Sequence, residues 1–161
     1  MIRAAVLALG LVLAGPAVAL SCFPQDVAET YRRAAEAAET YIVVHGRLSF
    51  DPARLPSTDM IPQQKPAHTL IPARLTGQAL TKGGFDQAFD RAITLDVQCF
   101  GPWCASAVPG TQYLGFLERR DGGYVLAVDP CGGMGHAEPT PAMLDKALRC
   151  LQGGACTAER R

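Results

Sequence analysis

The chain lacks an excess of charge of either sign, and it has few aromatic residues. Its 161 residues include 15 basic and 15 acidic side chains, so its formal net charge is zero. Nucleic-acid-binding proteins and proteins that adsorb to anionic membranes carry a basic excess, so we expect neither partner. Aromatic residues make up 7% of the chain, with Trp103 as the single tryptophan, whereas hydrophobic residues make up 48%. This hydrophobic content is ordinary for a globular protein with a core.

The motifs of the common catalytic sites are also absent. Acidic residues are scattered and form no pair suited to acid–base catalysis. The segments Lys82-Gly83-Gly84 and Cys131-Gly132-Gly133 lack the companion residues of a phosphate-binding loop. No nucleophile motif surrounds Ser21, Ser49, Ser57 or Ser106. We therefore expect a protein that is not an enzyme, without catalytic residues, cofactor or metal.

Long apolar runs are absent except at the N-terminus. Arg3 precedes an apolar run over residues 4–14, and the small residues Ala17-Val18-Ala19 follow. This pattern is typical of a secretory signal peptide, which we expect over residues 1–19, with cleavage after Ala19 or alternatively after Ser21. No other stretch reaches about 18 apolar residues, so stable membrane insertion after cleavage is not expected. Residues 20–161 would then form one domain of a periplasmic or extracellular protein.

All six cysteines lie outside the apolar part of the expected signal peptide. An even number of cysteines in an exported chain predicts three disulfides, with the connectivity left open. Cys99 and Cys104 have four residues between them and could instead form a redox pair or half of a zinc site. Redox pairs usually have two intervening residues, and an oxidising compartment disfavours thiolate ligands. We therefore favour a structural disulfide for this pair.

Alternating hydrophobicity predicts five strands. Residues 40–50 place Val44 and Leu48 on the core face and His45 on the outer face. Residues 89–99 place Arg91 on the same face as the apolar residues and Asp96 on the opposite face. The remaining strands are expected over 68–80, 111–119 and 123–130, with a hairpin turn between the last two.

A helix is expected at each end of the strand region. Asp26 opens the first, which continues to about residue 39, and Thr140-Pro141 opens the second. The apolar stripe of the first helix is expected to consist of Val27, Tyr31, Ala34, Ala35 and Ala38. Residues 51–67 contain four prolines and no steady period, which predicts a loop.

The histidines suggest no strong site. Met134 and His136 flank Gly135 close to Cys131, and these residue types can bind copper. No second pair of ligands is spaced nearby, so we favour a glycine-rich turn with solvated side chains. Trp103 either caps one end of the fold or provides an exposed anchor for a partner.

Several segments together resemble the tissue inhibitor of metalloproteinases and netrin-module superfamily, including its bacterial members. A single early cysteine, Cys22, precedes a short helix and the strand VVHGRLSF. Later in the chain come the segments VQCFGPWC and GTQYLGFLERRDGGYVLAVDPCGG, and then a helix that ends in Cys150. The resemblance covers roughly residues 20–150. It implies a β-rich fold, a five-stranded OB-like barrel with an N-terminal and a C-terminal helix, stapled by disulfides.

The resemblance also implies how the cysteines pair. Cys22 matches the second cysteine of the family's N-terminal Cys-x-Cys, whose partner corresponds to Cys131. The first cysteine of that motif is missing here, and its partner corresponds to Cys99, which leaves Cys104 close enough to pair with it. The last barrel cysteine corresponds to Cys150, just before Cys156. The expected disulfides are therefore Cys22–Cys131, Cys99–Cys104 and Cys150–Cys156.

Three classes of function are compatible with these observations. The first is an exported, non-catalytic binding or interaction domain whose partner is a protein, such as a protease or a component of the cell envelope. The second, implied by the resemblance, is a metalloprotease inhibitor that chelates the catalytic zinc through the amine of an N-terminal Cys22; cleavage after Ala19 would block it. The third is a secreted metal-binding or thiol redox protein that uses Cys99, Cys104 and His136. The candidate contact residues are Cys22, Phe23, Trp103 and Tyr113, with the 51–67 loop as a second contact region.

Overall fold

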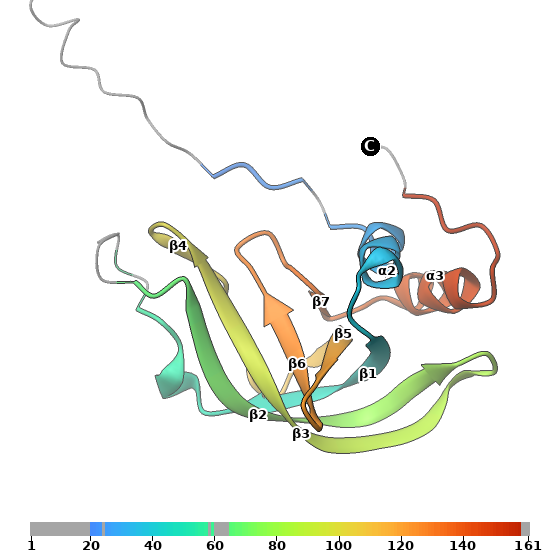
Figure 1. The fold of residues 1–161 in the computed structure, drawn as a ribbon, viewed down its shortest axis with the longest axis horizontal. Helices are drawn as coiled ribbons and strands as arrows, with labels where there is room; N and C mark the ends of the chain where they lie inside the picture. The colour runs from blue at the N-terminus through green and yellow to red at the C-terminus, as the bar shows by residue number, and fades with distance from the viewer. Residues whose placement is uncertain (1–19, 24, 58, 60–64, 159–161) are drawn as a thin grey trace, which may run out of the picture.

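The computed structural model describes residues 20–23, 25–57, 59 and 65–158 of the chain. A helix lies toward each end of this part, with strands between them (Figure 1). The elements are α2 (Val27–Glu36), β1 (Tyr41–Phe50), the 3-10 helix η1 (Pro52–Arg54), β2 (His68–Thr81), β3 (Gly84–Phe100), β4 (Trp103–Cys104), β5 (Gln112–Arg120), β6 (Gly123–Val128), β7 (Gly135–Ala137) and α3 (Pro141–Leu151). The expected signal peptide lies outside the described residues.

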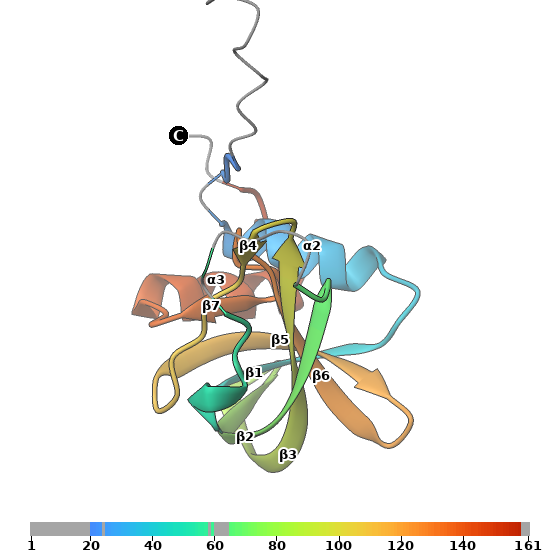
Figure 2. The same cartoon turned by 90° about the vertical axis from the view of Figure 1, so that its left-hand side faces the viewer.

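Five of the strands form a closed ring. β1 pairs antiparallel with both β2 and β5, and β2 pairs antiparallel with β3. β3 and β6 run parallel to each other, and β6 returns antiparallel along β5. The order around the ring is β1-β2-β3-β6-β5, while β4 pairs with β3 and β7 with β5 (Figure 1, Figure 2). Each ring strand therefore has a partner on both sides over part of its length, which limits the exposed sheet edge.

The five strands predicted by the alternating pattern all form, as β1, β2, β3, β5 and β6. β3 begins earlier than predicted, because Lys82-Gly83 makes a tight turn that joins it directly to β2. Gly84 follows that turn with a φ of 134°, a conformation that favours glycine. The sequence does not predict the short strands β4 and β7, because they lie within loops rich in glycine and proline.

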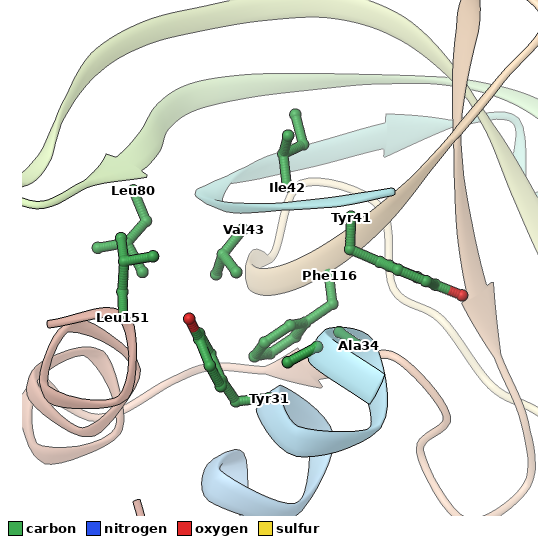
Figure 3. A pocket seen from close by; sticks show the side chains of 9 residues that line it. Tyr31, Ala34, Tyr41, Ile42, Val43, Leu80, Phe116 and Leu151 are labelled. Carbon is green, nitrogen blue, oxygen red and sulfur yellow. The ribbon is translucent and has the colours of Figure 1, made fainter. Parts of the chain in front are cut away.

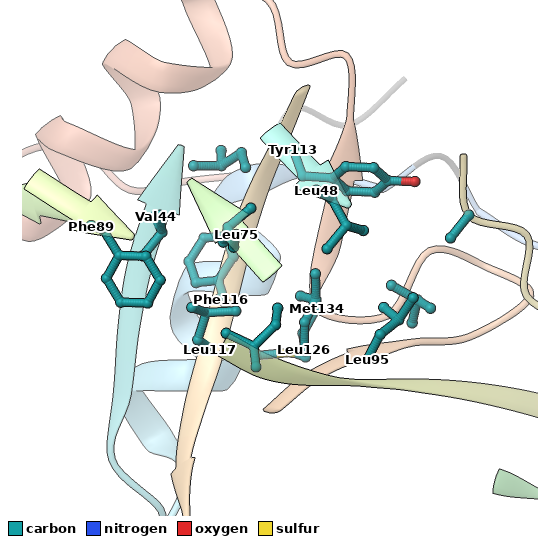
Figure 4. Packing of buried hydrophobic residues seen from close by; sticks show 14 of the residues in the cluster. Val44, Leu48, Leu75, Phe89, Leu95, Tyr113, Phe116, Leu117, Leu126 and Met134 are labelled. Carbon is teal, nitrogen blue, oxygen red and sulfur yellow. The ribbon is translucent and has the colours of Figure 1, made fainter. Parts of the chain in front are cut away.

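The hydrophobic core fills the inside of the ring. Val44 and Leu48 of β1 are fully buried, as the alternation predicts, and the intervening His45 is partly covered by Phe85, with 5.9 Å between the ring centroids. This burial lowers the pKa of His45. Figure 4 shows the core leucines packed between the strands, whereas Phe116 faces the same side of the sheet as Val43 and packs against Tyr31 of α2. Burial of these side chains is the main favourable term for this fold.

Two residues of β3 depart from the predicted alternation. Arg91 is exposed although the pattern assigns it to the core, while its neighbours on the same face, Phe89 and Ile93, are buried. Asp96 is 5% exposed although the pattern assigns it to the outer face. Its carboxylate accepts a hydrogen bond from Gln98 Nε2 at 2.9 Å and lies 3.0 Å from His68 Nδ1. These partners compensate the burial of the carboxylate.

Both helices begin where the sequence predicts. The Asp26 side chain caps α2 and the Thr140 side chain caps α3, each accepting a hydrogen bond from a backbone N–H of the first turn. The predicted apolar stripe of α2 is partly wrong, since Ala35 and Ala38 are exposed. The helix ends at Glu36, so Ala38 lies beyond it. The face of α2 that is covered consists of Val27, Ala28, Thr30, Tyr31 and Ala34.

Two glycines face each other where β1 and β2 approach closely. Gly46 is the register partner of Gly77. A Cβ atom on Gly77 would lie 2.1 Å from the carbonyl oxygen of His45 and 2.4 Å from the Cα of Gly46. Both are backbone atoms, so no side-chain rotation can relieve the contact. The pair therefore sets how tightly this side of the ring can close.

The Gly77→Ala variant is expected to lower the free energy of unfolding by about 1–3 kcal/mol, the usual cost of overpacking. Urea unfolding followed by circular dichroism measures the effect. Gly123→Ala is the matched control, because its Cβ would meet its nearest atom, the Arg120 oxygen, at 3.7 Å. Equal losses in the two variants would show that the close approach at Gly77 is not the cause.

Three disulfides link the described part of the chain, in the pairs that the resemblance implies: Cys22–Cys131, Cys99–Cys104 and Cys150–Cys156. Cys99 and Cys104 thus form the structural disulfide that the spacing favours. Disulfides persist in oxidising environments, so three of them indicate an extracellular-type compartment. None of the helices within the described ranges is long and apolar enough to cross a membrane.

Candidate functional site

The N-terminal segment, residues 20–23, is tied to the loop between β6 and β7. Cys22 is bonded to Cys131 of that loop, and three residues later Gln25 Nε2 donates a hydrogen bond to the carbonyl oxygen of Gly133 at 2.5 Å. Phe23 lies between these two attachments and is 91% exposed. Figure 1 shows the segment at the same end of the molecule as β4 and the β6–β7 loop. An aromatic side chain is thus held in solvent on an anchored segment.

A hollow of about 490 Å³ borders this segment on the side of α2. Its wall combines the exposed ring of Phe23 with charged side chains of both signs, including Glu29 and Arg33 of α2. Asp129 adds a further carboxylate from the β6–β7 loop. This hollow suits a polar ligand surface better than a purely apolar one.

A second hollow, of about 330 Å³, borders the segment at Leu20 and is lined mainly by apolar residues. Trp103 and Pro130 contribute to its wall. Parts of the predicted 51–67 loop reach it as well, through Leu55, Pro56 and Lys65. We call residues 20–23 together with the two hollows that border them the N-terminal face. This face gathers three of the four predicted contact residues, Cys22, Phe23 and Trp103.

Trp103 is held by the tight turn that Cys99 and Cys104 close. The two cysteines are register partners, and Trp103 pairs with Phe100, which is 43% exposed. Trp103 is itself half-buried and lines the second hollow. It therefore takes a position between the two predicted alternatives, partly packed and partly available to a ligand. The disulfide within the turn limits its movement.

Tyr113 does not belong to this surface, contrary to the prediction. Its side chain is 3% exposed and belongs to the hydrophobic core. Its hydroxyl oxygen accepts a hydrogen bond from the backbone N–H of Val108 at 3.4 Å, and burial raises its pKa. The alternation of β5 places this residue inside the ring, where it packs rather than binds.

His136 is buried, so the predicted solvated turn is wrong at this residue. It is 4% exposed on β7, and its Nε2 lies 3.0 Å from the Thr30 hydroxyl of α2. That hydroxyl lies 3.2 Å from the carbonyl oxygen of Asp26 and donates to it, so Thr30 accepts from a neutral imidazole protonated at Nε2. Within the described ranges, no group of three or more His, Cys, Asp or Glu residues is arranged to hold a metal ion. His136 therefore links α2 to the ring.

Sequence reasoning missed Lys65. Its side chain is 3% exposed and its Nζ donates a hydrogen bond to the carbonyl oxygen of Pro102 at 3.0 Å. A lysine in a proline-rich segment is normally solvated, and only the packing of that segment against the β4 turn buries this one. No pattern in the sequence signals that contact.

A third, smaller hollow of about 180 Å³ lies where the helices meet the ring. Figure 3 shows the Tyr31 ring beside Phe116, with its hydroxyl directed toward Leu151, while the hydroxyl of Tyr41 is directed away from Tyr31. Burial raises the pKa of both tyrosines above their ordinary range. The remaining walls are apolar, and no charged side chain is among the described residues that line this hollow.

Comparison with known proteins gives no match, whether against protein-family models, curated proteins or solved structures. The resemblance to the inhibitor and netrin-module superfamily accordingly stays an expectation.

Proposed function

We propose that the protein is an exported, non-catalytic binding domain that engages a protein partner through its N-terminal face. The observation that carries the proposal is the 91% exposure of Phe23 on a segment bonded covalently to the β6–β7 loop. Aromatic residues are enriched among the residues that dominate binding energy at interfaces. Because the segment is anchored at Cys22, its backbone has less conformational freedom to lose on binding, which favours affinity.

The fold that we propose for this domain is an OB-like barrel. The ring order β1-β2-β3-β6-β5 and the parallel closure between β3 and β6 support it. OB-folds are small Greek-key barrels that bind varied ligands on one face and its neighbouring loops. The proposed binding surface here lies instead at the end of the ring that carries the N-terminal segment. The ring thus serves as a rigid support for that segment.

Metalloprotease inhibition is a second candidate, favoured by the bond between Cys22 and Cys131. This disulfide would hold the amine of Cys22 in place as a zinc ligand if cleavage occurred after Ser21. Cleavage after Ala19 would leave Leu20 and Ser21 in front of Cys22 and prevent chelation. The intact mass of the exported protein distinguishes cleavage after Ser21 from cleavage after Ala19. A chain that begins at Cys22 calls for a protease inhibition assay, and a chain that begins at Leu20 eliminates this mechanism.

Site-specific photo-crosslinking tests the main proposal. A photoreactive phenylalanine analogue at position 23 is expected to give one discrete adduct in cells that export the protein. The same analogue at Leu70, which is 64% exposed on β2, is the matched control and is expected to give none. Phe23→Ala should weaken the purified complex by about tenfold or more, as expected of a central aromatic contact. Equal crosslinking at both positions, or none at position 23, would contradict the proposal.

A further inference from the structure

We propose that the hollow beside Trp103 is a binding site for an apolar carboxylate, with the Lys65 ammonium as the group that meets its charge. The inference rests on the proposed function, because this hollow belongs to the N-terminal face, and it adds a ligand class held by Lys65 and Trp103; the contact of Phe23 is tested separately by crosslinking. The ligand class follows from the chemistry of the wall, from the burial of Lys65 and from the contacts of its ammonium.

The wall of this hollow is apolar apart from one charged side chain. Among the described residues that line it, Lys65 is the single ionisable one. The surrounding side chains supply hydrocarbon and one indole ring; they include Leu20, Leu55, Pro56, Trp103 and Pro130. The volume, about 330 Å³, lies at the lower end of the range for ligand sites. A small apolar group therefore fits, and any formal charge that it carries should be negative.

The Lys65 ammonium has hydrogen-bonding capacity beyond its protein contacts. An ammonium carries three N–H donors, and the carbonyl oxygen of Pro102 accepts one of them at 3.0 Å. The nearest carboxylate, that of Asp59, lies 3.8 Å away, which is too long for a hydrogen bond. Asp59 is also 57% exposed, so solvent screens its attraction. Lys65 itself is 3% exposed, and a charge so poorly hydrated gains more from an anionic partner.

These contacts favour a carboxylate on an apolar body over a neutral molecule or a small inorganic anion. The carboxylate would take the place of the distant Asp59 as the partner of Lys65. The apolar body would pack against Trp103 and the aliphatic wall. Two sources supply this chemistry, namely a free organic acid and the C-terminal carboxylate of a peptide that ends in an apolar residue.

Trp103 provides a direct readout, because it is the only tryptophan of the chain. The exported protein, with its disulfides intact, is titrated with phenylacetate and with phenylacetamide, which differ in charge but little in shape. N-acetyl-Gly-Phe, with a free or an amidated C-terminus, forms the second pair. We expect each acid to change the Trp103 fluorescence saturably and to bind at least about tenfold more tightly than its amide. Preference for one acid would identify the source, and binding without any acid preference would overturn the proposal.

Two charge variants and one control locate the site. Lys65→Met keeps an apolar chain of similar length and should abolish the preference for acid over amide. Asp59→Asn removes the competing carboxylate and should tighten acid binding by a few fold. Lys82→Met removes the same charge from the exposed β2–β3 turn, away from the hollow, and should leave acid binding unchanged. Near-ultraviolet circular dichroism verifies that each variant folds. If Lys65→Met does not fold, the acid affinity of Asp59→Asn tests the proposal instead. Unchanged or weaker acid binding by Asp59→Asn would overturn the proposal.

Discussion

Replacing Cys22 and Cys131 by serine is expected to lower the free energy of unfolding by about 5 kcal/mol. The disulfide joins residues separated by 109 positions and so closes the longest loop among the three disulfides of the described residues. In the chain-entropy model a disulfide stabilises by restricting the unfolded chain, and the effect grows with the length of the loop. A loss of this size approaches the whole stability of many small domains.

Guanidinium unfolding of the double variant measures this loss. The matched control is the double serine variant of Cys150 and Cys156, whose disulfide spans only six positions. Its expected loss is about 2 kcal/mol in the same model. If the two variants lose equal stability, the loop-length argument fails. If the Cys22 variant is fully stable but no longer forms the Phe23 adduct, the disulfide serves binding and contributes little to folding.

Acidification is expected to destabilise the protein through His136, by about 3 kcal/mol once the pH falls below 4. Burial lowers the pKa of His136 from 6.5 to about 4, with smaller effects from Asp26, which raises it, and Arg33, which lowers it. In the unfolded chain this imidazole takes up a proton near pH 6.5, whereas in the folded protein it stays neutral. The unfolded state therefore binds more protons between about pH 6.5 and 4. Stability is full above that window and falls as the pH is lowered through it.

Urea unfolding at pH 7 and pH 5 detects most of this effect, with about 2 kcal/mol expected between the two values. The His136→Gln variant retains a polar side chain that can reach Thr30, and it should lose most of the pH dependence in this interval. His45, whose pKa is also lowered by burial, contributes in the same direction and accounts for a smaller remainder. An unchanged pH dependence in His136→Gln would show that another group is responsible.

The strands of the ring are predictable because their residues alternate between two environments. Val44 and Leu48 of β1 face a core that runs along the strand, so the period of two appears in the sequence. The same reasoning fails for Arg91, which precedes the part of β3 that pairs with β6 and is exposed between the buried Phe89 and Ile93. The hydrophobic pattern of a single strand carries no information on where its neighbouring strand begins. That information requires the register of the whole ring.

Of the contacts that build the candidate site, the sequence predicts the disulfides but not the packing of the irregular segments. The resemblance implies that Cys22 and Cys131 pair, as they do, while Phe23 is exposed and its role as a contact residue stays a prediction. The burial of Lys65 and of His136 is not predictable from the sequence. Each lies in a segment rich in proline or glycine, which predicts solvent exposure, but distant residues bury both of them. Long-range packing of irregular segments leaves no periodic signal in the sequence.

The bond between Cys22 and Cys131 also determines how the protein would respond to mechanical force. All five ring strands, from Tyr41 to Val128, lie between these two cysteines along the chain. Tension applied between residues before Cys22 and residues after Cys131 therefore passes through the disulfide and bypasses the ring. While the bond is oxidised, only β7, α3 and the flanking segments can be pulled out into an extended chain. Reduction would release the ring as well, so the extension of the stretched molecule would report the redox state of one bond.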